Sequence, residues 1–221
     1  MNISELVIAK NHHYCILNKP AGLPAVPDTT GDISLLQIAE QYFKQKLFVV
    51  HRIDRPVSGI VLFAKNKKNA AFFSALWKEQ KIEKEYLALI EGHFEKNSGV
   101  LKDHIDLKIS KGNKSRTNVS EETNAETAFD IIAPMENYTL LSLKPHTGRH
   151  HQLRLQLARH LAPIKGDVKY GARRANKDRS IHLHAYQISF AHPVSGEQLS
   201  FFAPVPDEKL WQDAFKKTSS L

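Results

Sequence analysis

The sequence predicts a mixed α+β fold, and three observations support this prediction. Short apolar runs bounded by polar turns recur along the chain, as expected of buried strands. Two longer stretches, 35–46 and 69–80, instead repeat apolar residues at helical spacing. The 221 residues contain no internal repeat, no low-complexity segment and no linker-like composition, so we expect a single domain over 1–221.

Local signals place the elements in order along the chain. Ser34 and Gln37 form the pattern of a capping box ahead of the first helix. The stretch 108–127 is polar, and we expect a mobile, solvated excursion at the surface there. The expected strands are 6–9, 14–17, 47–50, 60–64, 84–92, 127–132, 139–143, 182–190 and 199–202, and the expected helices are 35–46, 69–80, 153–161 and 210–217.

Composition and charge restrict the class of protein. Lysine and arginine number 31 against 23 acids, and the formal net charge of +8 favours a polyanionic partner, nucleic acid before a membrane surface. Cys15 is the single cysteine, which excludes an internal disulfide and favours a buried, inert thiol. The first ten residues do not resemble a signal peptide, and no apolar run approaches the ~20 residues that span a bilayer. We therefore expect a cytoplasmic protein without a membrane partner, monomeric by default.

A dense ionisable cluster lies between two apolar runs, 47–50 and 60–64. It consists of His51-Arg52-Ile53-Asp54-Arg55-Pro56-Val57-Ser58-Gly59. Positive charge on both sides of Asp54 favours its carboxylate form, and flanking strands would hold the group in one place, as a reactive group requires. The local sequence leaves an alternative open, in which Asp54 caps or closes a surface turn and the arginines are solvated.

A second cluster, Lys144-Pro145-His146-Thr147-Gly148-Arg149-His150-His151-Gln152-Leu153-Arg154, precedes a helical pattern. With the first cluster it resembles the RluA-like branch of the pseudouridine synthase superfamily. The first cluster resembles that branch's His-Arg-Leu-Asp and Thr-Ser-Gly signature, and the second its Gly-Arg-Thr-His-Gln-Ile-Arg motif. The further matching segments, in the branch's order, are Asn18-Lys19-Pro20-Ala21-Gly22, Ala64-Lys65, Lys84-Glu85-Tyr86-Leu87-Ala88, Gly166-Asp167 with Tyr170-Gly171, Leu183-His184-Ala185 and His192-Pro193.

The resemblance covers 14–204, and this chain departs from the pattern at four places. Ile53 stands where leucine is usual, Val57 and His150 where threonine is usual, and Gln156 where histidine is common. The small N-terminal RNA-binding module of the S4 type that many relatives carry has no counterpart here, so we expect a stand-alone catalytic domain. The resemblance implies a pseudouridine synthase-like fold, with a mixed, largely antiparallel central β-sheet flanked by helices and loops.

The resemblance also implies the activity, an isomerisation of uridine to pseudouridine in a structured RNA, either ribosomal or transfer RNA. The reaction breaks the bond from N1 to C1′, turns the uracil and joins C5 to C1′. No redox change or external group is involved, so we expect no cofactor and no metal. A carboxylate is suited to attack at C1′, as in retaining glycosidases, or to deprotonation of the sugar, and the sequence leaves both routes open.

The resemblance assigns roles to particular residues. Asp54 is the implied catalytic carboxylate, and Arg154 is implied to pair with it and keep it oriented. Tyr86 would stack on the target uracil and is a candidate for removing the C5 proton. The base must leave its stack to be reached, and Arg52 resembles the residue that enters the RNA in its place. The other expected RNA contacts are His51, which also supports the loop, and Lys19, Arg149, Arg173 and Arg174.

Three questions stay open at this point. The stretch 108–127, with Lys108, Lys111, Lys114 and Arg116, is either solvated or in contact with RNA. A second class of function is a non-catalytic RNA-binding protein, which an intact set of Asp54, Tyr86 and Arg154 disfavours. A third is a metal hydrolase, which the absence of a His-Glu-x-x-His pattern disfavours; its candidate ligands are His146, His150, His151, His182 and His184.

Overall fold

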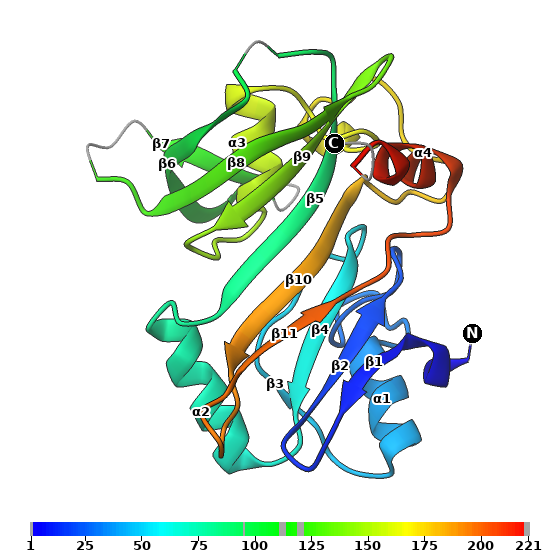
Figure 1. Cartoon of the computed structure of the whole chain (residues 1–221), viewed down its shortest axis with the longest axis vertical. Helices are drawn as coiled ribbons and strands as arrows, with labels where there is room; N and C mark the ends of the chain where they lie inside the picture. Colours follow the sequence, from blue (N-terminus) through cyan, green and yellow to red (C-terminus); the bar gives the residue numbers. More distant parts are fainter. Residues whose placement is uncertain (1, 95, 111–113, 119–121, 219–221) are drawn as a thin grey trace. The chain divides into compact units, whose positions relative to one another are not determined.

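A computed structural model of the chain describes residues 2–94, 96–110, 114–118 and 122–218 (Figure 1). The chain folds into two compact units, which are described in turn. Unit 1 comprises Met1–Lys84 and His184–Pro206, and unit 2 comprises Glu85–Leu183 and Asp207–Leu221. In the described part of the chain, no helix is long and apolar enough to cross a membrane.

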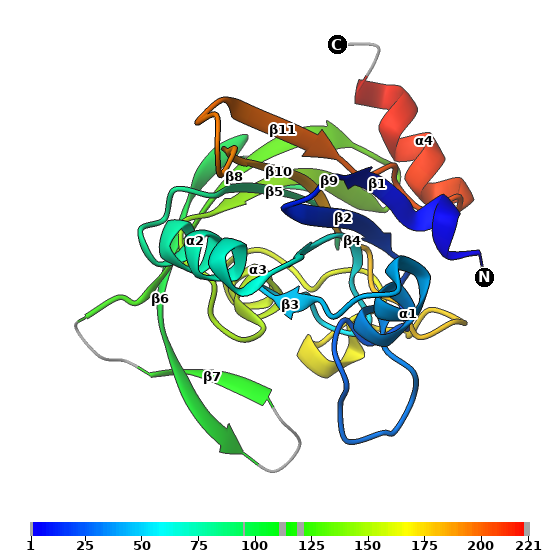
Figure 2. The same cartoon turned by 90° about the horizontal axis from the view of Figure 1, so that it is seen from below.

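Unit 1 is a mixed sheet with two helices. β1 (Val7–Lys10) pairs antiparallel with β2 (Tyr14–Lys19), β2 with β4 (Ser58–Ala64), and the short β3 (Phe48–Val49) with β4. β10 (Leu183–Ala191) runs parallel to β4 and antiparallel to β11 (Gln198–Phe202). α1 (Leu35–Phe43) and α2 (Lys67–Lys78) lie on the same side of these strands (Figure 2), and the 3-10 turn η1 (Ile3–Leu6) precedes β1.

The core of unit 1 follows from its apolar strands. Every residue of β4 is buried, as a central strand covered on both faces requires. Phe73 on α2 meets Tyr14 and Phe190 edge to face, with ring centroids 5.8 and 5.1 Å apart. Cys15, in β2, is fully buried, and burial raises the pKa of its thiol to about 12. The prediction of a buried thiol is confirmed.

Unit 2 is an antiparallel sheet in the order β5-β9-β8-β6-β7. Its strands are β5 (Glu83–Glu91), β6 (Ser98–Ser110), β7 (Lys114–Asn118), β8 (Ala125–Pro134) and β9 (Tyr138–Pro145). α3 (Gln152–His160) packs on the β6 side of this sheet, and α4 (Lys209–Thr218) packs on β8. The 3-10 turn η2 (Val168–Tyr170) follows α3.

Most predicted elements are confirmed within a few residues. The capping box is confirmed too: Ser34 Oγ accepts from the Gln37 amide at 3.3 Å, and Gln37 Oε1 accepts from the Ser34 amide at 2.9 Å.

The expected excursion over 108–127 is wrong as a description of the backbone. β6 extends to Ser110 and pairs antiparallel with β7, so part of this stretch is a strand pair. The RNA contact left open for Lys111 falls on a residue outside the described ones.

Candidate active site

Asp54 lies on the connection between β3 and β4 in unit 1, as the sequence predicts. The amide of Val57 donates to the Asp54 carbonyl oxygen at 3.0 Å, which closes a tight turn through Pro56. Val57 and Ser58 are buried and anchor the end of this turn in the core, while Asp54 is half-buried. The acid therefore lies on a short connection that is fixed at its end by a buried strand.

Gly59 sets how closely β4 and β10 approach at the end of that turn. Its φ of +111° is a left-handed conformation, and a Cβ built there would lie 2.3 Å from the Ala185 carbonyl oxygen. Beside it, Ser58 Oγ lies 2.9 Å from Nδ1 of the fully buried His184, whose Nε2 faces the Ala203 carbonyl oxygen at 3.3 Å. Burial lowers the pKa of His184 to about 4, so the imidazole is neutral and pins the two strands together.

Lys19 has no exposed surface, although the sequence analysis expects it to contact RNA. Its ammonium donates to the carbonyl oxygens of Pro20, Leu23 and Arg55, at 2.9, 2.8 and 3.1 Å. Burial lowers the pKa of Lys19 to about 7, the Asp54 carboxylate raises it, and the charge of Arg55 lowers it. The buried ammonium of Lys19 therefore donates to three backbone carbonyl oxygens of unit 1, and this argues against the predicted contact of Lys19 with RNA.

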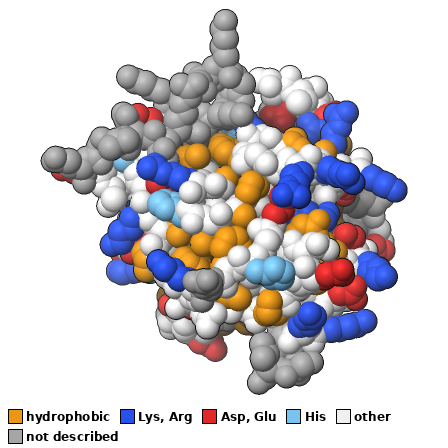
Figure 3. All heavy atoms as spheres, turned by 90° about the horizontal axis from the view of Figure 1, so that it is seen from above, with side chains coloured by type: hydrophobic (Ala, Val, Ile, Leu, Met, Phe, Trp, Pro, Cys, Tyr) orange, Lys and Arg blue, Asp and Glu red, His pale blue; other side chains and the backbone are white. Residues whose placement is uncertain are grey.

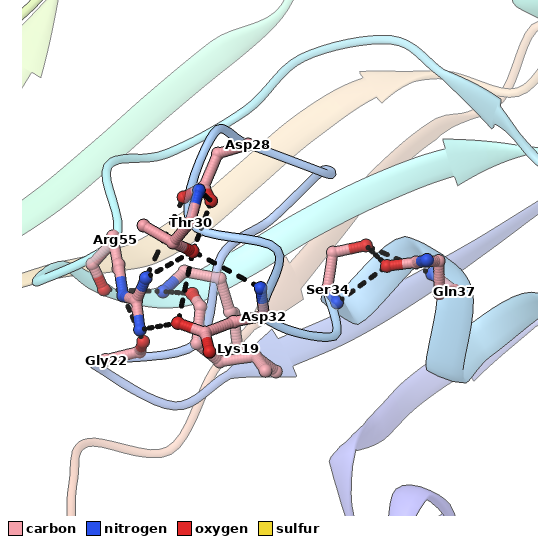
Figure 4. Close-up of polar contacts among 9 residues, drawn as sticks. Lys19, Gly22, Asp28, Thr30, Asp32, Ser34, Gln37 and Arg55 are labelled. Atoms are coloured by element: carbon pink, nitrogen blue, oxygen red, sulfur yellow. Dashed lines mark hydrogen bonds and ion pairs between the residues drawn. The ribbon is translucent and has the colours of Figure 1, made fainter.

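The residue after Asp54 is held by the same loop (Figure 4). The Arg55 carbonyl oxygen accepts from the Gly22 amide at 2.8 Å, and Arg55 Nε donates back to the Gly22 carbonyl oxygen at 2.8 Å. The guanidinium continues to Thr30 Oγ1 at 3.0 Å and to Asp32 Oδ2 at 2.6 Å. We call these contacts of Lys19 and Arg55 the loop clamp, because they join the loop at 19–32 to the residue next to Asp54.

His51 and Arg52 occupy different environments. Nε2 of His51 accepts from the Leu62 amide at 2.9 Å, and its ring stacks on Trp77 with centroids 4.4 Å apart. Burial, with the charge of Lys84, lowers the pKa of His51 to about 3, so it is a neutral imidazole that fixes the start of the loop. Arg52 is exposed. The loop-supporting role expected of His51 agrees with this geometry, and its contact with RNA stays a prediction.

Tyr86 lies in β5 of unit 2, opposite Leu143 of β9. It is half-buried, whereas the four residues that follow it, 87–90, are all buried. The run of apolar residues therefore reflects a strand covered on both faces, as the sequence analysis expects. On the preceding residue, Glu85 Oε1 accepts from Ser142 Oγ at 2.6 Å, which ties this end of β5 to β9.

Arg154 lies on α3 and forms a two-point contact with Asp167. Its Nε and Nη2 donate to Oδ2 and Oδ1 of Asp167, each at 2.7 Å. Only 6% of the arginine side chain and 1% of the aspartate side chain are exposed. The pairing of Arg154 with Asp54 that the resemblance implies stays a prediction. Asp167 has no assigned role in the sequence analysis, although it belongs to one of the quoted motif segments.

Two glutamines lock α3 to the sheet of unit 2. Gln152 Oε1 accepts from Thr147 Oγ1 and from the Arg149 amide, at 2.8 and 2.9 Å. Its Nε2 donates to Thr127 Oγ1 at 3.0 Å, and Thr127 in turn donates to Gln156 Oε1 at 2.7 Å. Gln156 therefore fills the position where a histidine is common and completes a buried polar chain beneath α3.

The remaining predicted RNA contacts are solvent-exposed cations. Arg149, Arg173 and Arg174 are all exposed, and Arg173 Nε lies 4.0 Å from Glu91 Oε2. On the face shown in Figure 3, Lys and Arg side chains lie at several separate places with acidic side chains among them. Such cations bind phosphates without reading sequence, and their contact with RNA stays a prediction.

The buried histidines put forward as metal ligands are engaged by protein groups. His182 Nε2 lies 2.7 Å from Glu208 Oε2, and its Nδ1 lies 3.1 Å from Asn176 Nδ2. Both ring nitrogens of His184 also face partners, Ser58 and Ala203. A metal ligand needs a free lone pair on the imidazole, so this geometry disfavours the metal hydrolase alternative for these two residues.

Comparison with known proteins identifies the family. Residues 13–159 match the family model described as RNA pseudouridylate synthase. The tRNA pseudouridine synthase C of Vibrio parahaemolyticus is 30% identical, over 96% of this chain and 94% of that protein. The dual-specificity RNA pseudouridine synthase RluA of Pasteurella multocida is 33% identical, over 90% and 92%. The solved structure of human RNA pseudouridylate synthase domain containing 4 has the same fold, with a TM-score of 0.77 at 22% identity over 98% and 94% of the two chains.

The fold and the motif-bearing loops define an RNA-modifying isomerase. The chain belongs to the RNA pseudouridylate synthase family, and it converts uridine to pseudouridine in RNA. The predicted family, fold class and reaction are thereby confirmed, and the non-catalytic and metal hydrolase alternatives are not favoured.

Proposed function

We propose that Asp54 is the catalytic carboxylate of this RNA pseudouridine synthase, with Tyr86 and Arg154 as its partners. The observation that carries the proposal is the loop clamp. A buried ammonium and an arginine hold the backbone beside Asp54 in place, although Asp54 itself is only half-buried. Such support is what a reactive group needs and a solvated turn does not. We also propose that the two units act together as one catalytic domain, since Asp54 lies in unit 1 and its partners lie in unit 2.

The chemistry requires one carboxylate and no external group. In one route Asp54 attacks C1′ as the bond from N1 to C1′ breaks, the uracil leaves with the electron pair, and C5 then attacks C1′ and displaces the Asp54 carboxylate. In the other, Asp54 removes the proton from C2′ and the uracil leaves by elimination. C5 then bonds to C1′ while Asp54 returns the proton to C2′. In both, the proton lost from C5 is balanced by one gained at N1, so the product is an isomer. Tyr86 is our candidate for stacking on the turned uracil and for accepting the C5 proton.

The substrate is a structured RNA with an accessible loop. Flipping the uridine out of its stack costs a few kcal/mol, which contacts to the RNA backbone and stacking on Tyr86 offset. The exposed Arg52, two residues before Asp54 in sequence, is our candidate for occupying the vacated position. Arg149, Arg173 and Arg174 hold phosphates in this proposal, so affinity falls as salt rises.

We propose ribosomal or transfer RNA as the substrate and the cytoplasm as the location. Relatives matched over nearly their whole length are named for transfer RNA, and a ribosomal large subunit pseudouridine synthase C of Vibrio cholerae is 31% identical over 92% of this chain. A single, unpaired cysteine fits a reducing compartment.

The test is a map of pseudouridine in all RNAs of cells with and without the protein. We expect at least one site in transfer or ribosomal RNA to disappear with the protein and to return when purified protein is added to that RNA. If every site persists without the protein, and purified protein modifies neither class of RNA, the proposed function is wrong.

A further inference from the structure

The guanidinium of Arg154 is held from its edge and from one face by a single short turn of unit 2. Asp167 takes the edge through the two 2.7 Å hydrogen bonds to Nε and Nη2. The ring of Tyr170, in η2, takes the face, with its centroid 5.1 Å from the guanidinium carbon. Edge and face contacts together fix both the position and the plane of the group, which neither contact alone achieves.

The same turn is fastened to the strand that carries Tyr86. The amide of Lys165 donates to the Leu89 carbonyl oxygen in β5 at 2.9 Å. The Asp167 carbonyl oxygen accepts from the Tyr170 amide at 3.0 Å, which closes the turn. One segment, 164–171, therefore connects β5 to the guanidinium on α3.

We propose that Asp167 and Tyr170 are positioning residues for pseudouridine formation: they hold Arg154 in a fixed orientation relative to β5 and Tyr86. The inference rests on the proposed function, in which Arg154 and Tyr86 serve the reaction. Neither Asp167 nor Tyr170 needs to touch RNA for this role.

The contact also defines what Arg154 supplies. The buried carboxylate of Asp167 neutralises the charge of Arg154. In the reaction Arg154 therefore acts as a hydrogen-bond donor whose N–H groups point in a fixed direction. A lysine cannot reproduce this, since its ammonium has no plane to fix and no two-point geometry. Arg154→Lys is therefore expected to lower kcat although the charge is kept.

Tyr170 also connects the turn to the start of α3. Its hydroxyl lies 2.8 Å from Nδ1 of His151, the residue that caps α3 with a φ of +56°. The two contacts of Tyr170 can be separated by substitution. Tyr170→Phe keeps the ring on the guanidinium and removes the hydroxyl, whereas Tyr170→Leu removes both.

The test compares Asp167→Asn with a matched control, a second buried acid that contacts the same helix. Asp103 is also buried and also bonds α3, through Arg159 Nη1 at 3.2 Å and His160 Nε2 at 2.9 Å. Asp103→Asn thus reports the general cost of losing a buried acid under α3. We expect Asp167→Asn to lower kcat about 30-fold or more, with KM within about twofold, because a small misplacement of a reacting array is costly. Asp103→Asn should leave kcat within about threefold.

Two further comparisons extend the test, and the first of them needs no Asp167→Asn protein. Tyr170→Leu should lower kcat about tenfold and Tyr170→Phe should restore most of it, since the ring is the part that holds Arg154. If Asp167→Asn folds, the double variant Arg154→Lys/Asp167→Asn should have a kcat less than about twofold below that of Arg154→Lys alone. The two substitutions disrupt the same contact between Arg154 and Asp167, so their effects should not add. Equal kcat in Asp167→Asn and Asp103→Asn, or equal losses in the two Tyr170 variants, would overturn the proposal.

A readout independent of activity separates this inference from the proposed function. The Nε–H of Arg154 should give a protected NMR resonance in the wild type and in Asp103→Asn, and should lose protection in Asp167→Asn or Tyr170→Leu. If the wild type modifies no RNA, the proposed function fails while this signal still decides the positioning role. Unchanged protection of the Arg154 Nε–H in both Asp167→Asn and Tyr170→Leu would show that the 164–171 segment does not hold Arg154.

Discussion

Arg154 and Asp167 meet edge to edge, with two hydrogen bonds of 2.7 Å between side chains that are almost fully buried. The charge of Arg154 is therefore matched within unit 2. In the proposed pairing with Asp54, Arg154 would take part as an oriented donor with a matched charge. Arg154 would then orient Asp54 through directed hydrogen bonds, which differs from supplying positive charge alone.

The loop clamp predicts that Arg55 matters for rate more than for stability. Arg55→Met removes the side-chain bonds to Gly22, Thr30 and Asp32, and we expect kcat to fall about tenfold because the neighbouring Asp54 is less well placed. The ion pairs of Arg55 are solvent-exposed, so the melting temperature should change little. Steady-state pseudouridine formation and thermal unfolding measure the two effects.

Lys81→Met is the matched control for Arg55→Met. It removes another solvent-exposed ion pair of unit 1, between Lys81 and Glu79 at 2.7 Å. Equal kcat in the two variants would mean that the clamp does not support the reaction.

Gly59 is predicted to tolerate no side chain. In Gly59→Ala the new Cβ would overlap the Ala185 backbone and φ would stay at +111°, so we expect a loss of at least about 4 kcal/mol in the free energy of unfolding, or no folded protein. Gly196→Ala, with a φ of +72° and nothing within 4 Å, isolates the backbone strain, about 1–3 kcal/mol. Urea titration of both variants makes the comparison, and similar losses would contradict the close approach of β4 and β10.

Lys19 offers a titration that reports on Asp54. The ¹³Cε chemical shift of Lys19 should titrate with a midpoint near 7, because burial lowers its pKa to about 7 from 10.5. The Asp54 carboxylate raises this pKa, so Asp54→Asn should move the midpoint below that of the wild type. An unchanged or higher midpoint in Asp54→Asn would mean that the carboxylate does not act on the clamp.

The buried, neutral His184 predicts acid destabilisation. Its pKa is about 4 in the folded chain and 6.5 when unfolded, so below pH 6.5 the unfolded chain binds more protons. Stability from this group is complete above pH 6.5 and is lost as pH falls from 6.5 towards 4, by about 2 kcal/mol between pH 7 and pH 5. His184→Asn, whose Oδ1 can accept from Ser58, should show a correspondingly shallower dependence of the unfolding free energy on pH. An identical dependence in both proteins would rule out this contribution.

The sequence predicts most of the elements that bury an apolar face, and its ordered motifs predict the family and the candidate site loops. The capping box at Ser34 and the doubly buried β5 follow from local patterns. β6 (Ser98–Ser110) and β7 (Lys114–Asn118) were both missed. β7 is polar, and backbone pairing of a polar strand leaves no hydrophobic period to detect. In β6 the buried Asp103 stands between the buried Leu101 and Ile105 and interrupts the apolar alternation.

Contacts between distant segments were the part of the site that sequence reasoning missed. Lys19 follows an apolar strand and precedes a proline, and nothing local indicates that three carbonyl oxygens surround its ammonium. Asp167 lies in a turn thirteen residues after Arg154. Its motif carries no assigned chemical role, so the motif does not indicate that the Asp167 carboxylate binds the Arg154 guanidinium. The partner of a buried lysine or acid depends on the tertiary structure, and the spacing of apolar residues in the sequence does not indicate it.

The central claim, that Asp54 is the catalytic carboxylate, is tested most directly by single-turnover pseudouridine formation with Asp54→Asn on the RNA that the wild type modifies. Asparagine keeps the size of the side chain and removes the carboxylate. We expect the rate to fall by at least about 10⁴-fold while the affinity for the RNA stays within about threefold, since the group acts in the chemical step and contributes little to binding. A variant that still forms pseudouridine at a rate near that of the wild type would contradict the account.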